Sequence, residues 1–257
     1  MENLKKFIDN TNEWDLYNGF FLNNDIERLR KFLVREHFFR MSLDLPGDIV
    51  EIGVFKGTGM AQLLKLREIF IPASNKKVIG FDLFSESNNY KETLTNNNLK
   101  LDEYYTNSGI NMEEGISTDD ISGFLNKMKL TNTRMGFNTD IYQLIEGDVE
   151  KTIPVYLEKN PGFRISYLYL DLDIDKPTYT SLNMLYDRIV RGGIIIFDEY
   201  ACEKWTESNA VDRFLKEHPD LNIKTLLWGR TPTAYIIKNN INKNNVNKNN
   251  INDVGYN

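Results

Sequence analysis

Two hydrophobic patterns alternate along most of this chain: apolar residues at helical spacing, and short runs that are almost wholly apolar. The first pattern predicts a helix from a cap at Asn24 or Asp25 to about Met41, and further helices at about 60–70, 117–128, 177–190 and 207–216. The second predicts buried strands at 48–52, 77–82, 141–146, 165–171, 193–198, 223–227 and 234–238. Apolar strands separated by helices indicate an α/β fold in which helices cover both faces of a mostly parallel sheet.

Two segments interrupt this alternation. Residues 85–140 are largely polar, and an insertion of this length inside a compact domain is typical of a lid or a binding loop. Residues 239–257 form an asparagine-rich tail, in which 239–253 repeat every five residues, a period that matches neither a helix nor a strand. We therefore expect one domain at 1–238 that contains the inserted lid, followed by a tail whose deletion leaves the activity intact.

Composition narrows the class of protein. The net charge of -6 argues against a general binder of nucleic acid. The amino terminus lacks the apolar segment of a signal peptide, and no run approaches the roughly 18 apolar residues of a membrane span. The single cysteine, Cys202, cannot form an intramolecular disulfide, which favours a reducing compartment. We expect a cytoplasmic protein with neither a nucleic-acid nor a membrane partner.

The first chemical signal is a glycine-rich turn between the strand at 48–52 and the helix that follows it. Its glycines, Gly53, Gly57 and Gly59, have the spacing G-x-x-x-G-x-G, which fits neither a dinucleotide fingerprint nor a phosphate loop. Asp82 ends the next strand, where a carboxylate can accept both hydrogens of a ribose diol, and Asp148 follows the third. Three consecutive strand ends of this kind indicate a site for a nucleoside-shaped ligand.

The second signal is a group of acids after two later strands. Asp171 ends the strand at 165–171, and the pair Asp198-Glu199 follows the strand at 193–198. If these strands are neighbours, the carboxylates converge, and no Lys, Arg or His lies within two residues of either strand end. Such carboxylates must share protons, pair with bases or bind a cation, and this oxygen donor set suits Mg²⁺ better than Mn²⁺ or Ca²⁺. Asp173 and Asp175 are interpreted as caps or solvated loop residues.

The segments that carry these signals are Leu45-Pro-Gly-Asp-Ile-Val-Glu-Ile-Gly-Val-Phe-Lys-Gly, Gly80-Phe-Asp-Leu-Phe, Leu170-Asp-Leu-Asp with Pro177-Thr178, Gly192-Gly-Ile-Ile-Ile-Phe-Asp-Glu-Tyr, and Thr231-Pro-Thr-Ala-Tyr. Together they resemble the class I methyltransferases that use S-adenosylmethionine, and more closely the macrocin and mycinamicin group of sugar O-methyltransferases. The resemblance covers about residues 26–238. It implies a Rossmann-like fold with a seven-stranded, mostly parallel sheet.

The resemblance also implies a role for each site residue. The methionine part of S-adenosylmethionine would be bordered by Glu51, Gly53, Gly57, Thr58 and Gly59. Asp82 would hold the ribose, and Asp148 would lie near the adenine. A divalent cation, expected to be Mg²⁺, would be held by Asp171, Asp198 and Glu199. The chain departs from its relatives at Asp175-Lys176, where they often have Tyr-Glu, and at Glu199, where they have Asp.

The expected reaction is metal-dependent transfer of a methyl group to a hydroxyl of a sugar, by analogy a nucleotide-activated deoxyhexose or heptose used for a surface polysaccharide or glycoside. A sugar hydroxyl is barely ionised at neutral pH, so a metal must lower its pKa or a base must take its proton. His37 is interpreted as a helix-packing residue and His218 as a helix cap, which leaves Asp171 as the candidate base. We also expect a homo-oligomer.

Three other interpretations stay open at this point. The same acids would serve an O-methyltransferase of a catechol or another small phenol. A non-haem iron oxygenase would need His37 together with His218 and Asp220. A binding module would keep the nucleoside pocket without catalysis. The acceptor would be selected by the insertion and by the loop at 200–206, whose candidate contacts are Tyr104, Tyr105, Tyr200 and Trp205.

Overall fold

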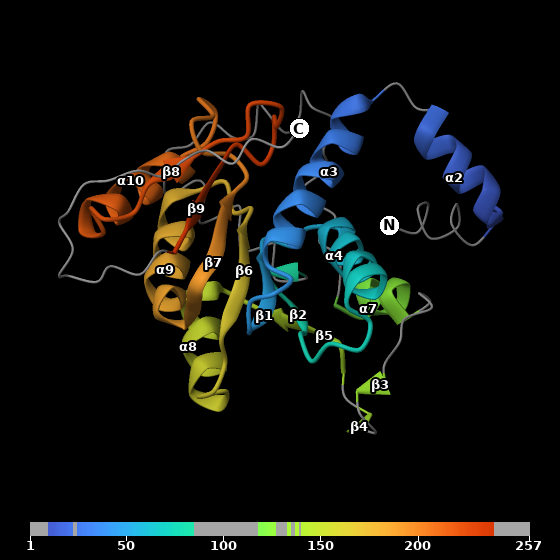
Figure 1. The fold of residues 1–257 in the computed structure, drawn as a ribbon, viewed down its shortest axis with the longest axis horizontal. Coiled ribbons are helices and arrows are strands. Elements are labelled where there is room, and N and C mark those ends of the chain that lie inside the picture. Colours follow the sequence, from blue (N-terminus) through green and yellow to red (C-terminus); the bar gives the residue numbers. More distant parts are fainter. Residues whose placement is uncertain are drawn as a thin grey trace.

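A seven-stranded sheet forms the centre of the protein (Figure 1). Its strands are β1 (Asp48–Ile52), β2 (Val78–Asp82), β5 (Tyr142–Glu146), β6 (Ile165–Leu170), β7 (Ile189–Phe197), β8 (Ile223–Lys224) and β9 (Ala234–Ile237). Their order is β5-β2-β1-β6-β7-β9-β8. Neighbours from β5 to β7 are parallel, whereas β9 runs antiparallel to both β7 and β8. The prediction of a mostly parallel, seven-stranded sheet is therefore confirmed.

The computed structural model describes residues 10–22, 25–84, 118–126, 133–134, 137–138 and 140–238. Most of the predicted insertion at 85–140 lies outside these residues, although they include a helix, α7 (Thr118–Asn126), and a two-stranded hairpin of β3 (Thr133–Arg134) and β4 (Phe137–Asn138). The tail at 239–257 lies wholly outside them, as do Tyr104 and Tyr105. None of the helices in the described ranges combines the length and apolar character needed to cross a bilayer.

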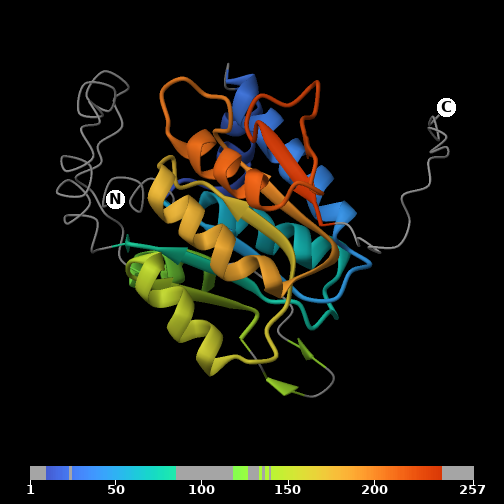
Figure 2. The ribbon, with the colours of Figure 1, turned by 90° about the vertical axis from the view of Figure 1, so that its left-hand side faces the viewer.

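Helices cover both faces of the sheet. On one face lie α3 (Ile26–Met41), α4 (Thr58–Phe70) and α7, and on the other lie α8 (Val149–Lys159), α9 (Asp175–Leu185) and α10 (Glu207–Glu217). Figure 2 shows the second group side by side in front of the strands. Each layer buries its own cluster of apolar side chains against the sheet, as the alternation of strands and helices predicts.

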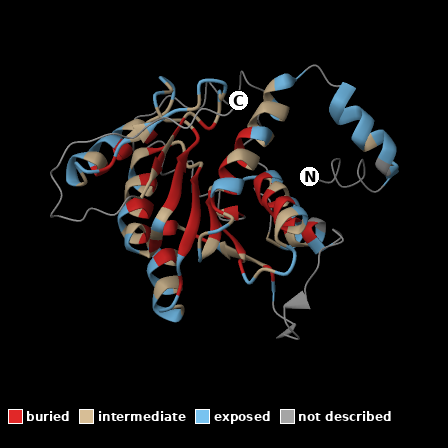
Figure 3. Cartoon of the chain, in the orientation of Figure 1, coloured by how far each residue is buried: buried red, intermediate tan, exposed pale blue. Residues whose placement is uncertain are grey.

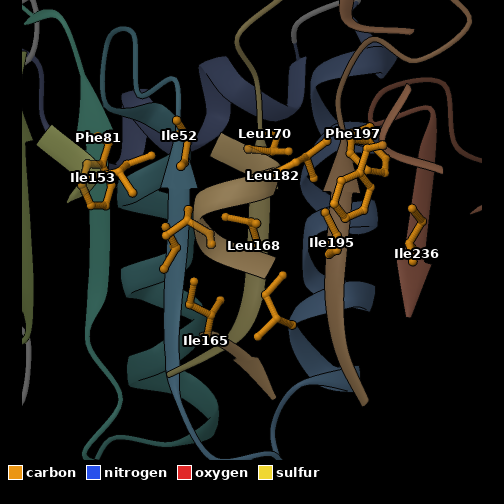
Figure 4. Close-up of a cluster of buried hydrophobic side chains, with 14 of the residues drawn as sticks. Ile52, Phe81, Ile153, Ile165, Leu168, Leu170, Leu182, Ile195, Phe197 and Ile236 are labelled. Atoms are coloured by element: carbon orange, nitrogen blue, oxygen red, sulfur yellow. The ribbon is translucent and has the colours of Figure 1, made fainter. Parts of the chain in front are cut away.

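The strand β6 shows how one run of residues serves both layers. Leu168 and Leu170 pack in the cluster beneath α8, α9 and α10 (Figure 4), whereas Tyr167 and Tyr169 pack beneath α3 and α4. Successive side chains of a strand point to opposite faces, so a strand covered on both faces needs apolar residues at every position. The central strands are accordingly the most deeply buried part of the protein (Figure 3).

Several helical boundaries differ from the predicted ones. The helix α8 was not predicted, because Pro154 interrupts a pattern that otherwise places Val149 and Ile153 one turn apart on the core. The helix expected at 177–190 ends earlier: α9 is followed by a 3-10 turn, η2 (Tyr186–Arg188), and β7 begins at Ile189. A further helix, α2 (Glu13–Leu22), was also missed, and its side chains are mostly exposed (Figure 3).

The turn that enters β1 offers a test of the fold away from the candidate site. Gly47 has a φ of 104°, and a Cβ atom there would lie 2.9 Å from the backbone carbonyl of Arg164. We expect Gly47→Ala to lower the free energy of unfolding by about 1–3 kcal/mol in urea denaturation, because both the conformation and the space require glycine. Gly162→Ala is the matched control, since a Cβ at Gly162 meets nothing within 4 Å. Equal stability of the two variants would contradict this interpretation.

Candidate active site

The carboxyl ends of the parallel strands meet at one edge of the sheet, and strand pairing continues into the predicted site residues. The N–H of Asp171 donates to the carbonyl of Ile52 at 2.8 Å, and the N–H of Asp198 donates to the carbonyl of Leu170 at 3.0 Å. The condition that β6 and β7 are neighbours is met, because the two strands pair in parallel. The acids predicted from separate parts of the sequence are therefore held side by side by the backbone.

Asp82 holds the backbone of the glycine-rich turn in place through hydrogen bonds. One carboxylate oxygen of Asp82 accepts the N–H groups of Val54 and Phe55 at 2.6 and 2.7 Å. Burial raises the pKa of Asp82, and these backbone hydrogen bonds oppose the rise. Gly53, with a φ of 91°, passes so close to the next strand that a Cβ would lie 1.9 Å from the carbonyl oxygen of Asp171. The turn and the acidic edge are thus in direct contact.

The remaining predicted cofactor residues lie at the starts of helices. Gly57, with a φ of 80°, precedes α4, whose first residue is Thr58 and whose amino terminus has no side-chain cap. Asp148 is the cap of α8, and its carboxylate accepts the N–H of Glu150 at 3.0 Å. Uncapped backbone N–H groups at a helix start favour oxygen atoms of a ligand. Both helix starts stand at the same edge as Asp82, because β5, β2 and β1 are consecutive in the sheet.

Glu51 lies beneath the turn in a buried ion pair. Its carboxylate contacts the guanidinium of Arg35 at 2.7 Å, and the two side chains are 1% and 4% exposed. Burial raises the pKa of Glu51, and Arg35 opposes this rise. A Cβ on Gly59 would lie 1.9 Å from a carboxylate oxygen of Glu51, so a larger residue at position 59 would displace the Glu51 side chain from its pairing with Arg35. The second oxygen, Oε2, is buried and has no hydrogen-bond partner among the described residues.

Asp171 and Asp198 share a cation that the sequence pattern did not indicate. Nζ of Lys31 lies 2.8 Å from Oδ2 of Asp198 and 3.3 Å from Oδ2 of Asp171. Burial lowers the pKa of Lys31, but the two carboxylates outweigh it, so this pKa lies above its ordinary value. The other oxygen of Asp198 accepts a hydrogen bond from the hydroxyl of Tyr169, whose ring stacks on Arg35 at 3.8 Å. Arg35 also lies 3.9 Å from Asp171.

Three further acids complete the cluster: Asp173, Glu199 and Glu207. Burial and the neighbouring carboxylates raise the pKa of Asp173 well above its ordinary value, and the residue is half-buried. The same two causes raise the pKa of Glu199 to about 7. Glu207, a residue that the sequence analysis missed, accepts the backbone N–H of Glu199 at 3.1 Å. Its other oxygen is buried and has no partner within the described ranges.

The structure brings two of the three predicted metal ligands to one cation. Asp171 and Asp198 converge on Lys31, whereas the carboxyl of Glu199 interacts with the thiol of Cys202. Across the part of the chain that the structure describes, no group of three or more potential ligands already surrounds a metal position. Asp171 is more accessible than Asp198, with 26% of its side chain exposed against 3%. Burial and then Asp198 raise the pKa of Asp171 to about 6.

The two histidines lie in packing positions, as expected. His37 packs edge-on against the rings of Phe38 and Trp228. His218 caps the carboxyl end of α10, and its ring lies against Tyr186.

A cavity of about 710 Å³ opens between α7, β5 and α8 at the outer edge of the sheet, but none of the predicted site residues lines it. The predicted site residues lie instead at or just beyond the carboxyl ends of β1, β2, β5, β6 and β7.

A comparison with protein families shows which family the chain belongs to. The family model of macrocin O-methyltransferase (TylF) matches residues 28–225. The chain belongs to the macrocin O-methyltransferase family. It is an S-adenosylmethionine-dependent O-methyltransferase with a Rossmann-like class I fold. The iron oxygenase and the non-catalytic binding module are set aside by this assignment. No curated protein matches the sequence of the chain.

Solved structures agree with the macrocin O-methyltransferase assignment. The apo structure of CalS11, a TDP-rhamnose 3'-O-methyltransferase of calicheamicin biosynthesis, is 25% identical and matches with a TM-score of 0.65 over 92% of this chain and 91% of that one. The O-methyltransferase NovP is 18% identical, with a TM-score of 0.58 over 82% of this chain and 80% of that one. TomG from Streptomyces achromogenes, solved with S-adenosylmethionine, is 10% identical with a TM-score of 0.50 over 88% and 95%. The last two similarities support the fold alone.

The buried ion pair generates a test of how the site is stabilised. We expect Arg35→Met to lower the free energy of unfolding by about 3–5 kcal/mol, because Glu51 would be left buried without its partner. The double variant Arg35→Met/Glu51→Gln should recover a large part of that loss. Urea denaturation measures both, with Arg191→Met, at an exposed position, as the control. If the effects of the two substitutions simply added, the pairing would not be the stabilising interaction.

Proposed function

We propose that this enzyme transfers the methyl group of S-adenosylmethionine to a hydroxyl of a sugar. The acceptor class that we propose is a nucleotide-activated deoxyhexose or heptose used for a surface polysaccharide or glycoside. The family description and the similarity to CalS11, which acts on TDP-rhamnose, support this choice. The observation that carries the proposal is the match of the macrocin O-methyltransferase family over residues 28–225. The convergence of Asp171 and Asp198 beside the glycine-rich turn supports the location of the reaction, and not the choice of acceptor.

We propose that the cofactor lies across the ends of β5, β2 and β1. Its methionine part would be bordered by Glu51, Gly53, Gly57, Thr58 and Gly59, its ribose held by Asp82, and its adenine placed near Asp148. The uncapped start of α4 offers backbone N–H groups to a ligand carboxylate. The unpartnered Oε2 of Glu51 is an acceptor of the kind that an ammonium group requires.

We propose that the acidic edge holds a divalent cation, Mg²⁺, through Asp171, Asp198 and Glu199. Its donors are all oxygen atoms, and its buried carboxyls outnumber the two cations that the described chain places near them. Burial raises the pKa of three of these carboxyls, Asp173, Glu199 and Glu207, and repulsion by the neighbouring carboxyls raises it further. Bound there, Mg²⁺ would act as a Lewis acid that lowers the pKa of the acceptor hydroxyl.

The chain's own residues would align the acceptor and move its proton. Asp171 is the proposed base, because 26% of its side chain is exposed and it lies at the acidic edge beside the glycine-rich turn. Tyr169 and Glu207 would hold the adjacent acids, the first through Asp198 and the second through the backbone of Glu199. Alignment of the acceptor oxygen, the methyl carbon and the sulfur atom can contribute roughly 7–11 kcal/mol to lowering the barrier.

A substrate panel tests the acceptor class. The protein is incubated with S-adenosylmethionine, Mg²⁺ and either nucleotide sugars or catechols, and the release of S-adenosylhomocysteine is measured. We expect turnover with a nucleotide deoxyhexose and none with catechol. Turnover with catechol alone would favour the alternative acceptor, a small phenol, for which the same acids would serve.

Substitution of the proposed base tests the metal mechanism. Asp171→Asn should reduce methyl transfer about a hundredfold or more, and chelation of divalent cations should abolish turnover of the unmodified protein. Asp220→Asn, which makes the same substitution at an exposed aspartate, should leave the rate of methyl transfer unchanged. Full activity of Asp171→Asn, or turnover that survives chelation, would show that the mechanism does not use a metal at this position.

A further inference from the structure

The cation position between Asp171 and Asp198 contains a charged group of the protein itself. Nζ of Lys31 is within 3.3 Å of one carboxylate and within 2.8 Å of the other, and it contacts the Oδ2 atom of each. Magnesium binds carboxylate oxygens at roughly 2.0–2.1 Å. An ion bound to both Oδ2 atoms would therefore require the space and the lone pairs that the ammonium group uses. The ammonium group and the ion exclude each other.

Lys31 and Arg35 are one helical turn apart on α3, but they are held differently. The side chain of Lys31 is 21% exposed and lies in the first half of the helix, whereas the buried residues of α3 begin at Val34. Arg35 is 4% exposed, pairs with Glu51 and stacks on Tyr169. A lysine ammonium on a flexible four-carbon stem can change position without movement of the helix. The planar guanidinium of Arg35, by contrast, is held by Glu51 and by the ring of Tyr169.

We propose that Lys31 is an exchangeable counter-ion, which neutralises Asp171 and Asp198 while the site lacks a metal and is displaced when a divalent cation binds. The inference rests on the proposed function, because it takes these two acids as metal ligands. Displacement leaves the ammonium near another carboxyl of the same cluster, since Asp173 also interacts electrostatically with Lys31. Lys31 thus keeps the metal-free protein stable at the expense of metal affinity.

Removal of Lys31 should therefore strengthen metal binding rather than weaken it. We expect Lys31→Met to bind Mn²⁺ at least about tenfold more tightly than the unmodified protein, because the competing conformation is eliminated. Lys31→Arg should bind no more tightly than the unmodified protein, since a guanidinium pairs with carboxylates more persistently than an ammonium. Lys151→Met, which removes a positive charge from an exposed position on α8, should leave the affinity unchanged.

The experiment is a calorimetric titration of Mn²⁺ into the full-length variants, without cofactor or acceptor, with circular dichroism to verify folding. Lys31→Gln takes the place of Lys31→Met if the latter does not fold, with the same expected tightening. Asp171→Asn is included to identify the site and should bind Mn²⁺ weakly or not at all.

The outcomes separate this inference from the proposed function. Tighter binding by Lys31→Met together with loss of binding by Asp171→Asn supports the exchange. Unchanged or weaker binding by Lys31→Met, with loss in Asp171→Asn, overturns the exchange and leaves the proposed metal site in place. If Mn²⁺ binds to none of the variants, or binds equally to Asp171→Asn, the metal site and the exchange are both wrong.

Discussion

Charge compensation at the carboxyl edge of the sheet is the constraint on which the rest of the site depends. Parallel strands that end in acids place those acids side by side, and in this protein their burial raises the pKa of several of them. Carboxylates so placed need cations within a few ångströms. The helix α3 supplies two of them, Lys31 and Arg35, by crossing the strand ends with one face. Its position is therefore an electrostatic requirement as well as a packing one.

The same interactions join the two halves of the site. Arg35 pairs with Glu51 beneath the glycine-rich turn, and its guanidinium stacks on Tyr169, which donates to Asp198 in the acidic half. Gly53 in turn contacts the backbone of Asp171. A methyl transferase must hold the methyl donor and the acceptor in line, and a continuous chain of buried contacts limits their relative displacement. The link from Glu51 to Asp198 provides that chain within the protein.

The sheet could be predicted from the sequence because strands buried on both faces are apolar at nearly every position, and the end of each strand marks a residue of the site. Asp82, Asp171 and Asp198 were predicted as site residues in this way, and the structure places them at the same edge of the sheet. Lys31 was not, because it meets Asp171 across 140 positions of sequence and local spacing says nothing of such a contact. The sequence feature that could have indicated this contact is the pair Lys31 and Arg35, which stand four residues apart on a helix with an apolar face. Glu207 was missed because its complete burial depends on packing between segments that are distant in the sequence, which local spacing does not show.

The central claim is that Asp171 and Asp198 form a cation site in which Lys31 and a metal alternate. Anomalous diffraction from crystals grown with Mn²⁺ and S-adenosylhomocysteine tests it most directly. The account predicts an anomalous peak at roughly 2.0–2.2 Å from a carboxylate oxygen of each acid, with Nζ of Lys31 withdrawn from both. A Lys31 side chain that still bridges the two carboxylates, with no peak between them, would contradict it.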